Sequence, residues 1–398
     1  MISNKKSILF IGGQINPIPA VRGGAVQTLV TALIDENEKA GLFDFTVCTG
    51  ENPQLDLLRD KYKLCEIITV RKNRLRRAFL FVYRVIRKLL LDKLPRKTDF
   101  MISVNRKIRG RHFDAVIFET SLLELEQVKC NNDAKVFFHV HADFMTASTR
   151  RIDIAAEKCD YVIAVSDFIK SRVLTYTPFD NRVVTLKNAI DLELSRHLSG
   201  EEIRREMRGK LGYTDDDVVV LYCSRLSPEK GCLELIRAVK KVPQCKLLIV
   251  GGENFSSDRE TEYVKMLREE AASFSDRVVF TGYVPHSDVF TYMCASDIGV
   301  VPSVCNEAAS LTVLEMRSAS LATVAVHRGG IPEYTDEEKS VFVEPGENFT
   351  DELAAAINRL VCDPELRQRL AQNATVGLDS FGYMAYYRAF AELMNEYL

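Results

Sequence analysis

Short apolar runs that alternate with longer helical stretches restrict the fold of this sequence more than any other feature. Runs of about four to eight apolar residues, bounded by turn residues, are typical of buried strands. Their alternation with helical patterns predicts βαβ units and parallel sheets. We predict strands at 7–13, 45–49, 66–70, 115–119, 136–141, 161–166 and 183–186, and a second set at 218–224, 246–252, 278–284, 298–303, 322–326 and 341–343.

The two sets of strands predict two doubly wound, Rossmann-like α/β domains instead of one large sheet. A chain of 398 residues also exceeds the size at which a single core usually stops growing. The polar, charged region 191–217 separates the sets, so we expect an N-terminal domain at 1–190 and a C-terminal domain at 191–378. The last stretch, 379–398, is predicted to be an amphipathic helix that crosses back to the N-terminal domain.

Composition excludes several classes of protein. The formal net charge of −2 argues against wholesale nucleic-acid binding. Ten cysteines are scattered without a C-x-x-C pair, which indicates reduced thiols and no structural zinc. The N-terminal apolar run is too short for a signal peptide, and no segment approaches the roughly 18 apolar residues of a membrane span. We therefore expect a cytoplasmic protein.

One basic segment, residues 71–97, departs from this background. It holds eleven Lys or Arg against the single acid Asp92. Between them, apolar residues recur at helical spacing: Leu75, Phe79, Val82, Ile86, Leu90 and Leu94. A basic amphipathic helix suits an anionic membrane surface, which predicts peripheral association with the inner face of the cytoplasmic membrane. The alternatives are a core-facing helix with a solvated basic face and, less favoured because no binding motif accompanies the charge, nucleic acid.

Two carboxylates stand eight residues apart in E-A-A-S-L-T-V-L-E, Glu307 to Glu315. Strand 298–303 ends just before Glu307, and a helix beginning near Ser310 holds Glu315, so the motif falls where doubly wound domains bind ligands. The first amides of such a helix suit an anion, and carboxylates accept hydrogen bonds from sugar or ribose hydroxyls. Together these groups fit a nucleotide sugar. Alone, the pair could equally be an exposed loop Glu and an ordinary helix Glu.

Two further motifs follow predicted strands. In S-R-L-S-P-E-K-G, Arg225 and Lys230 can clamp a diphosphate, although a solvated turn is the alternative. In P-A-V-R-G-G-A-V, Gly23 and Gly24 open a helix and let backbone approach a phosphate or sugar, but G-x-G-x-x-G is absent. The acids at 215–217 are interpreted as a solvated turn and not as a metal motif, so no metal is expected.

These motifs, taken in order, resemble the retaining glycosyltransferases of family 4, which have the GT-B fold. The resemblance covers nearly the whole chain. It includes V-H-A-D-F at 140–144, A-V-S-D-F-I at 164–169, K-N-A-I-D at 187–191, V-G-G at 250–252, T-G-Y-V-P at 281–285 and G-G-I-P-E at 329–333.

The resemblance implies a role for each matching position. Arg225 and Lys230 would hold the donor diphosphate, Glu315 the ribose hydroxyls and Glu307 the hydroxyls of the donor sugar. Further donor contacts are implied for Gly23, Gly24 and Asn188, for Tyr283 and Val284 at the nucleobase, and for Ala309, Ser310 and Leu311 at the helix start. His141 matches a histidine near the reaction centre, with His139 as the competing alignment.

The implied chemistry is front-face transfer with retention, in which the departing diphosphate helps to deprotonate the acceptor and neither metal nor cofactor is required. A covalent glycosyl-Glu307 intermediate is the disfavoured variant. The chain departs from the family at Val26, at Lys187-Asn188-Ala189, after Glu315 at Met316-Arg317, and at Ser320 and Ala322, where Gly and Pro are common. None of these departures removes a charged residue that handles the donor.

The sequence thus predicts an enzyme that moves a sugar from a nucleotide diphosphate donor, with UDP-sugar favoured, to a membrane-associated and lipid-linked acceptor during surface polysaccharide assembly. Two alternatives remain open. A nucleotide-sugar epimerase on the same fold would release free epimerised sugar, and a non-catalytic, membrane-bound nucleotide-sugar scaffold would release no nucleotide with any acceptor.

Overall fold

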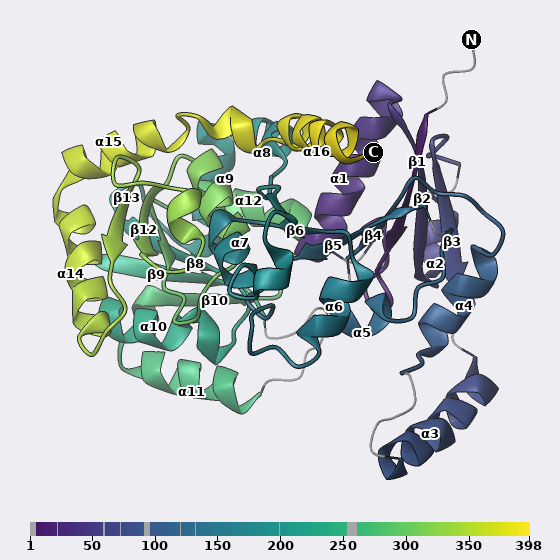
Figure 1. Ribbon diagram of the computed structural model, residues 1–398. Coiled ribbons are helices and arrows are strands. Elements are labelled where there is room, and N and C mark those ends of the chain that lie inside the picture. The colour runs from purple at the N-terminus through teal and green to yellow at the C-terminus, as the bar shows by residue number, and fades with distance from the viewer. Residues whose placement is uncertain are drawn as a thin grey trace. The chain divides into compact units, whose positions relative to one another are not determined.

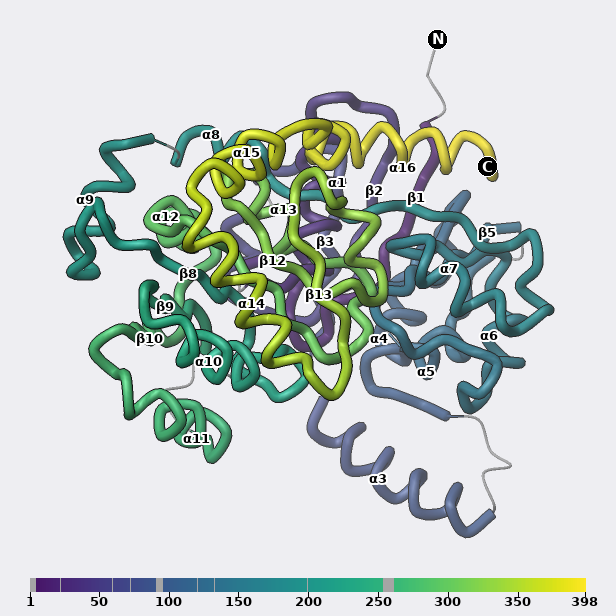
Figure 2. The backbone as a smooth tube through the Cα atoms, turned by 90° about the vertical axis from the view of Figure 1, so that its left-hand side faces the viewer, coloured from purple at the N-terminus to yellow at the C-terminus, as the bar shows by residue number. Residues whose placement is uncertain are grey.

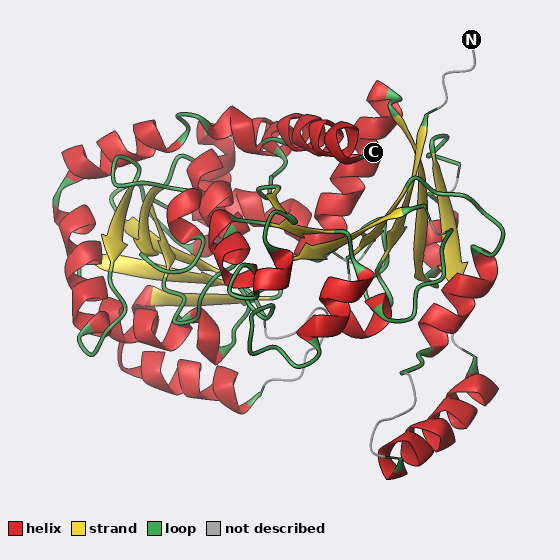
Figure 3. Cartoon of the chain, viewed as in Figure 1, coloured by secondary structure: helices red, strands yellow, loops and turns green. Residues whose placement is uncertain are grey.

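The computed structural model describes residues 5–21, 23–58, 60–71, 73–90, 96–119, 121–131, 133–198, 200–252 and 261–398. The chain divides into unit 1, Met1–Lys187 with Tyr383–Leu398, and unit 2, Asn188–Gly382. Within each unit, helices cover a sheet whose strands all pair in parallel, as Figure 1 and Figure 3 show. The prediction of two Rossmann-like parallel-sheet α/β domains is confirmed.

Unit 1 contains a seven-stranded sheet of order β3-β2-β1-β4-β5-β6-β7. The strand order reverses between β1 and β4, which makes the carboxyl ends of these two strands the switch point where such sheets bind ligands. The strands are β1 (Lys6–Ile11), β2 (Phe43–Gly50), β3 (Cys65–Val70), β4 (Ala115–Phe118), β5 (Lys135–Val140), β6 (Tyr161–Ala164) and β7 (Val183–Thr185). The helices are α1 (Ala25–Ala40), α2 (Pro53–Asp56), α3 (Arg74–Leu89), α4 (Asp99–Lys107), α5 (Leu122–Leu125), α6 (Ile152–Lys158), α7 (Asp167–Val173) and α16 (Tyr383–Tyr397).

Unit 2 contains a six-stranded sheet of order β10-β9-β8-β11-β12-β13, with its switch point between β8 and β11. The strands are β8 (Val218–Cys223), β9 (Cys245–Val250), β10 (Val278–Gly282), β11 (Ile298–Val301), β12 (Ala322–Val326) and β13 (Ser340–Val343). The helices are α8 (Leu192–His197), α9 (Glu201–Leu211), α10 (Cys232–Lys240), α11 (Glu262–Ala271), α12 (His286–Cys294), α13 (Leu311–Ser318), α14 (Phe349–Cys362) and α15 (Pro364–Ala374).

Every strand predicted from the apolar runs is present, and most bounds agree within two residues. The agreement has a physical reason: central strands of a parallel sheet are covered on both faces and therefore need continuous apolar sequence. Residues 8–11 of β1 and 247–249 of β9 are fully buried.

Helix α16 packs within unit 1 against α1 (Figure 1 and Figure 2). Phe390 lies among the rings of Phe10, Phe43 and Phe45, with centroid distances of 6.0, 6.0 and 6.2 Å. The hydroxyl of Tyr387 donates to Asn37 Oδ1 at 2.7 Å. The last helix of the chain thus completes the core beside the first strand.

Helix α3 forms over part of the basic segment, and most of its apolar side chains are exposed. Leu80 is the buried apolar residue of this helix, whereas the predicted stripe from Leu75 to Leu90 is exposed. The interpretation of α3 as a core-facing helix is therefore wrong for the described residues. Asp92 and Leu94 lie outside the described residues. In the described part of the chain, we find no helix with both the length and the apolar character needed to cross a membrane.

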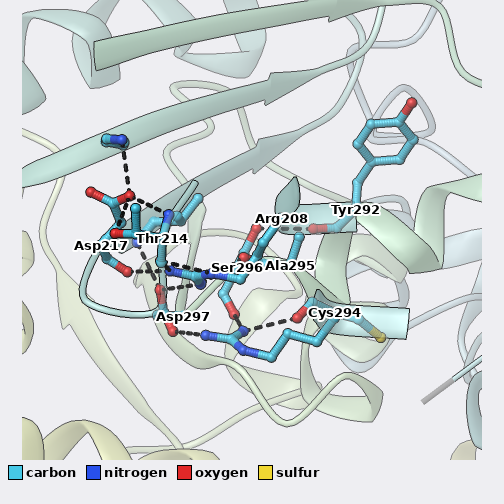
Figure 4. A network of polar contacts seen from close by, with 11 residues as sticks. Arg208, Thr214, Asp217, Tyr292, Cys294, Ala295, Ser296 and Asp297 are labelled. Atoms are coloured by element: carbon cyan, nitrogen blue, oxygen red, sulfur yellow. Dashed lines mark hydrogen bonds and ion pairs between the residues drawn. The ribbon is translucent and has the colours of Figure 1, made fainter. Parts of the chain in front are cut away.

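A buried arginine ties together the amino ends of the two switch-point strands in unit 2 (Figure 4). Arg208, 1% exposed, donates to the carbonyls of Thr214 at 2.6 Å and Ala295 at 3.0 Å, and it lies 3.3 Å from Asp297 Oδ2. The same Asp297 oxygen accepts from the Val219 amide of β8 at 2.7 Å. Because Asp297 directly precedes β11, this network fixes β8 beside β11.

The same network corrects one prediction. Asp217 is not simply solvated: its carboxylate accepts from the Thr214 amide at 2.6 Å and pairs with Lys246 at 2.9 Å. It closes the turn that leads into β8.

Arg208→Ala is expected to destabilise unit 2 by about 3–5 kcal/mol, because removal of the guanidinium leaves the buried carbonyls without their donor and takes a cation from Asp297. Chemical denaturation at pH 7 measures the loss. Arg205→Ala, a change of the same kind at an exposed position of α9, is the matched control and should lie within about 0.5 kcal/mol of wild type. Equal stability of the two variants would contradict the structural role of Arg208.

Candidate active site

The loops after β8 and β11 meet at the switch point of unit 2. After β8 the chain passes Arg225 and enters a short 3-10 turn, Pro228–Lys230, that ends at Gly231. Gly231 has φ of +72°, and a Cβ there would lie 1.9 Å from the carbonyl oxygen of Pro302, so only glycine fits. The Val304 amide donates to the Glu229 carbonyl at 3.0 Å. Backbone contacts thus hold the two loops together.

Lys230 and Glu307 form the central ion pair of this edge. Lys230 Nζ lies 2.6 Å from Glu307 Oε1, and both side chains are largely buried. Ser303 Oγ donates to the same carboxylate oxygen at 2.5 Å. The tight approach of Gly329, where a Cβ would lie 2.3 Å from the Glu307 carbonyl, fixes the backbone of the loop. The structure therefore brings two of the predicted site residues together with a serine that the sequence analysis did not single out.

Glu315 lies on α13, whose amino end Ser310 caps by accepting from the Val313 amide at 3.4 Å. Its partner is His286, the first residue of α12, with Nε2 at 3.1 Å from Glu315 Oε1. The hydrogen bond and charge of Glu315 raise the pKa of His286 to about 9. His286 is therefore a cation at neutral pH. Its position directly after the T-G-Y-V-P motif was the signal available in the sequence, but a lone histidine there does not reveal its partner.

The other predicted donor residues of unit 2 are distributed around this edge. Arg225 is more exposed than Lys230, with its guanidinium 3.7 Å from Glu229 Oε1. Tyr283 is exposed after β10, and its Cβ lies 3.3 Å from where a Cβ on Gly252 would be. Val284, Ala309 and Leu311 are partly buried. Asn188 is buried and its backbone N–H donates to the Tyr334 hydroxyl at 3.0 Å, whereas its side-chain Oδ1 meets no hydrogen-bond donor among the described residues.

Unit 1 presents a second cluster at its own switch point. Glu119 follows β4, and a Cβ on Gly12 at the end of β1 would lie 3.0 Å from the Glu119 Cβ. Glu119 Oε2 lies 3.1 Å from His139 Nδ1 and 2.6 Å from His141 Nε2. The two imidazole centroids are 4.0 Å apart. The carboxylate thus joins both candidate histidines, a relation that strand spacing alone did not reveal.

The electrostatics of this cluster indicate which of its groups carry protons. Burial opposes ionisation of Glu119, but the charge of His139 and the hydrogen bonds from both imidazoles outweigh it and lower the pKa of Glu119 to about 2. An ionised carboxylate only accepts, so His139 Nδ1 and His141 Nε2 must donate to it. Burial and the charge of His139 lower the pKa of His141. His141 therefore tends to be neutral, with Nδ1 as its basic nitrogen.

Exposure separates the two histidines. His141 keeps 15% of its side chain exposed and His139 only 3%. The geometry therefore favours His141 over His139 as the histidine that a ligand can reach.

The two predicted glycines of unit 1 stand just before α1. Gly23 has φ of +77° and Gly24 has φ of +113°. Arg22, in the same motif, lies outside the described residues.

Glu119, His139 and His141 are also the described residues best arranged to hold a metal, since one ligand atom from each lies within 4.8 Å of the others. At metal–nitrogen bonds of about 2.0–2.1 Å, tetrahedral ligand atoms would stand about 3.3 Å apart. The 2.6 Å between His141 Nε2 and Glu119 is a hydrogen-bond distance. We therefore interpret the cluster as a hydrogen-bond network.

Comparison with known proteins agrees with this architecture. The Anabaena protein HepE, solved in complex with UDP-glucose, superposes with a TM-score of 0.76 at 19% identity, covering 98% of this chain and 99% of that one. YtcC of Bacillus subtilis, a protein named as a glycosyltransferase, is 26% identical over 379 residues, 92% of this chain and 86% of that protein. The lipopolysaccharide 1,2-N-acetylglucosaminetransferase of Salmonella typhimurium is 25% identical over 290 residues, 71% of this chain and 72% of the enzyme.

The fold defines the class: two parallel-sheet Rossmann-like units of the GT-B type. Within unit 2, residues 203–376 match the family described as glycosyl transferases group 1.

The buried Glu119 predicts a dependence of stability on pH. Its pKa of about 2 in the folded state lies below the ordinary value of 4.5, so its contribution is present above pH 4.5 and is lost as the pH falls towards 2. When the pH falls from 5 to 2, the free energy of unfolding of Glu119→Gln should therefore decrease by about 2–3 kcal/mol less than that of wild type. Denaturant unfolding at both pH values measures this, with exposed Glu157→Gln as control. Parallel pH curves for wild type and Glu119→Gln would contradict the assignment.

The His286–Glu315 pair predicts an unusual titration. By NMR the imidazole of His286 should titrate near pH 9 in wild type and near 6.5 in Glu315→Gln, because the carboxylate stabilises the imidazolium. The associated stability is present below pH 6.5 and is lost as the pH rises through 9. Glu307→Gln is the control and should leave His286 unchanged. A wild-type midpoint near 6.5 would show that the pair does not form in solution.

Proposed function

We propose that this protein is a retaining glycosyltransferase, of the kind grouped in family 4, that transfers a sugar from a nucleotide diphosphate donor to a membrane-associated, lipid-linked acceptor. UDP-sugar is the favoured donor, and surface polysaccharide or glycoconjugate biosynthesis is the favoured setting. The observation that carries the proposal is the Lys230–Glu307 pair, at 2.6 Å, on the switch point of a group 1 domain. The UDP-glucose complex of HepE and the transferase activity named for the Salmonella relative support the donor class.

In this proposal each part of the donor meets a group of matching chemistry. Lys230 and Arg225 bind the diphosphate, because ammonium and guanidinium groups form charge-assisted hydrogen bonds with phosphate oxygens. Glu315 accepts from the ribose hydroxyls and Glu307 from the sugar hydroxyls. The nucleobase lies against Tyr283 and Val284. The amides of Ala309, Ser310 and Leu311 face the sugar and phosphate.

The reaction breaks the bond between the anomeric carbon and the diphosphate oxygen, and forms a bond from that carbon to the acceptor oxygen on the same face. Positive charge grows on the sugar ring and negative charge on the departing diphosphate. Lys230 and Arg225 stabilise the diphosphate, which takes the proton of the acceptor hydroxyl. His141, through its unprotonated Nδ1, accepts a hydrogen bond beside the donor sugar. The proposed mechanism requires neither a metal nor a cofactor.

The products separate this proposal from the two alternatives. Incubation with a UDP-sugar and membrane lipid extract should release UDP and give a glycosylated lipid. Free epimerised sugar would indicate the epimerase, whereas nucleotide binding without release of UDP would indicate the scaffold.

Nucleotide binding tests the donor site directly. In EDTA, UDP at about 100 times its dissociation constant should raise the stability of the native protein by about 2.7 kcal/mol. Lys230→Met should weaken UDP binding about 10- to 100-fold, since a hydrogen bond to a charged group contributes about 1.5–3 kcal/mol. Thermal shift measures the ligand-induced change, which remains interpretable if the variant itself is less stable. The exposed Lys240→Met is the matched control.

Three outcomes decide this test. Unchanged UDP affinity in Lys230→Met would remove Lys230 from the donor site. A larger thermal shift with GDP than with UDP would indicate a GDP-sugar donor instead of a UDP-sugar. No shift with any nucleotide diphosphate would contradict the proposed function.

A further inference from the structure

A cavity of about 540 Å³ lies in unit 1 where α3 begins beside α4, after the carboxyl end of the edge strand β3. Five of its eight lining residues are cations, Arg71, Arg74, Arg76, Arg106 and Lys107, and the others are Asn73, Leu75 and Ser103. None of these residues belongs to the proposed donor site. The cavity is therefore a separate feature that the proposed reaction leaves unexplained.

Few carboxylates balance these cations. Arg76 pairs with Asp99 at 3.1 Å and donates to Ser103, and Arg71 lies 3.6 Å from Glu51. Arg74, Arg106 and Lys107 have no carboxylate within ion-pair distance among the described residues. The first turn of α3 contains no acid, although a helix amino end favours negative charge. The cavity thus carries uncompensated positive charge, which suits a phosphate-type anion.

The helix at the rim of the cavity has an exposed apolar face. Leu75 is 84% exposed, Phe79 66% and Val82 54%, at the spacing of one helical face. Figure 1 and Figure 2 both show α3 beside α4 and away from the seven-stranded sheet of its unit. An apolar face next to a cationic cavity matches the order of groups in a bilayer, where acyl chains lie just below charged phosphates.

We propose that the cavity binds the phosphate of an anionic phospholipid while the apolar face of α3 inserts among the headgroups of the same bilayer. The inference deepens the membrane contact of the proposed function and rests on it for the choice of a bilayer. Arginine and lysine give the phosphate charge-assisted hydrogen bonds. Cations next to an anionic membrane surface add to the apolar contribution of the helix.

The position of the cavity distinguishes a bulk phospholipid from the phosphate of the acceptor. β3 and β5 are separated by three strands in the sheet, so their carboxyl ends are four strand spacings apart. At about 4.8 Å for each spacing, the carboxyl end of β3, which leads to the cavity, lies about 19 Å along the edge from that of β5, which His141 follows. A phosphate bound there is too far from His141 to be the one next to the reacting sugar. The cavity therefore anchors the protein to the surface and leaves the acceptor to bind elsewhere.

Vesicle binding tests the proposal without donor or acceptor. Wild type should bind phosphatidylcholine vesicles that contain phosphatidylglycerol and not pure phosphatidylcholine vesicles. The cavity variant, Arg74→Gln with Arg106→Gln and Lys107→Gln, should bind about a hundredfold more weakly, since each cation near an anionic surface contributes about fivefold. The control, Lys129→Gln with Lys158→Gln and Arg388→Gln, removes the same charge from exposed positions of unit 1 outside the cavity and should lose less than about threefold.

A second variant separates the apolar contribution from charge. Leu75→Ser with Phe79→Ser and Val82→Ser should also lose vesicle binding, although every cation remains. All substituted positions are exposed, and unchanged melting temperatures would verify the fold. Inorganic phosphate and glycerol 1-phosphate are the soluble probes, and wild type should bind them far more weakly than vesicles.

Several results would overturn the proposal. Equal losses in the cavity and control variants would mean that only net charge matters. Tight binding of free phosphate without vesicle binding would make the cavity a soluble-anion site. Failure of the proposed function looks different: vesicle binding without any UDP-induced stabilisation would refute the donor site and support the lipid cavity, whereas a UDP shift without vesicle binding would refute the cavity alone.

Discussion

Parallel pairing is the constraint on which the rest of the structure depends, because it sends the carboxyl ends of all strands in a sheet to one edge. In unit 2 this brings the Lys230 loop after β8 against the Glu307 loop after β11. In unit 1 it places Glu119 beside Gly12. The amino ends of β8 and β11 serve a different purpose, since there Arg208 joins them through buried hydrogen bonds. Stability and ligand chemistry thus occupy opposite edges of the same sheet.

The carboxylates at these edges are paired with basic side chains of the protein itself. Glu307 meets Lys230, Glu315 meets His286, and Glu119 meets two imidazoles. These pairs hold the side chains in fixed positions. They also set up a competition: an anion that binds Lys230 must share it with Glu307. In the proposed function, exchange of partners at Lys230 would therefore help to set how strongly a diphosphate is held.

The parts of this structure that could be predicted from the sequence are those determined by residues close together in the chain. Each buried strand is a continuous apolar run, and the helix cap at Ser310 follows directly from its position before an apolar stretch. The partnerships of His286 and Glu119 were not predictable, because each joins residues from different strand–helix units. The departure at Ser320 shows the same limit. Its φ of +55° lies in the left-handed region, which favours the glycine that is common at this position in the family that the chain resembles. Tertiary neighbours, which no spacing encodes, decide such positions.

The place of α16 has a consequence for how the protein is made. Unit 2 is one uninterrupted stretch of chain, Asn188–Gly382, whereas unit 1 is completed by Tyr383–Leu398. Phe10, Phe43 and Phe45 are therefore synthesised well before Phe390, the ring that packs against all three. The second unit can finish folding while the first still waits for its last helix. A chain interrupted before Tyr383 would carry a complete unit 2 attached to a unit 1 that lacks one of its core helices.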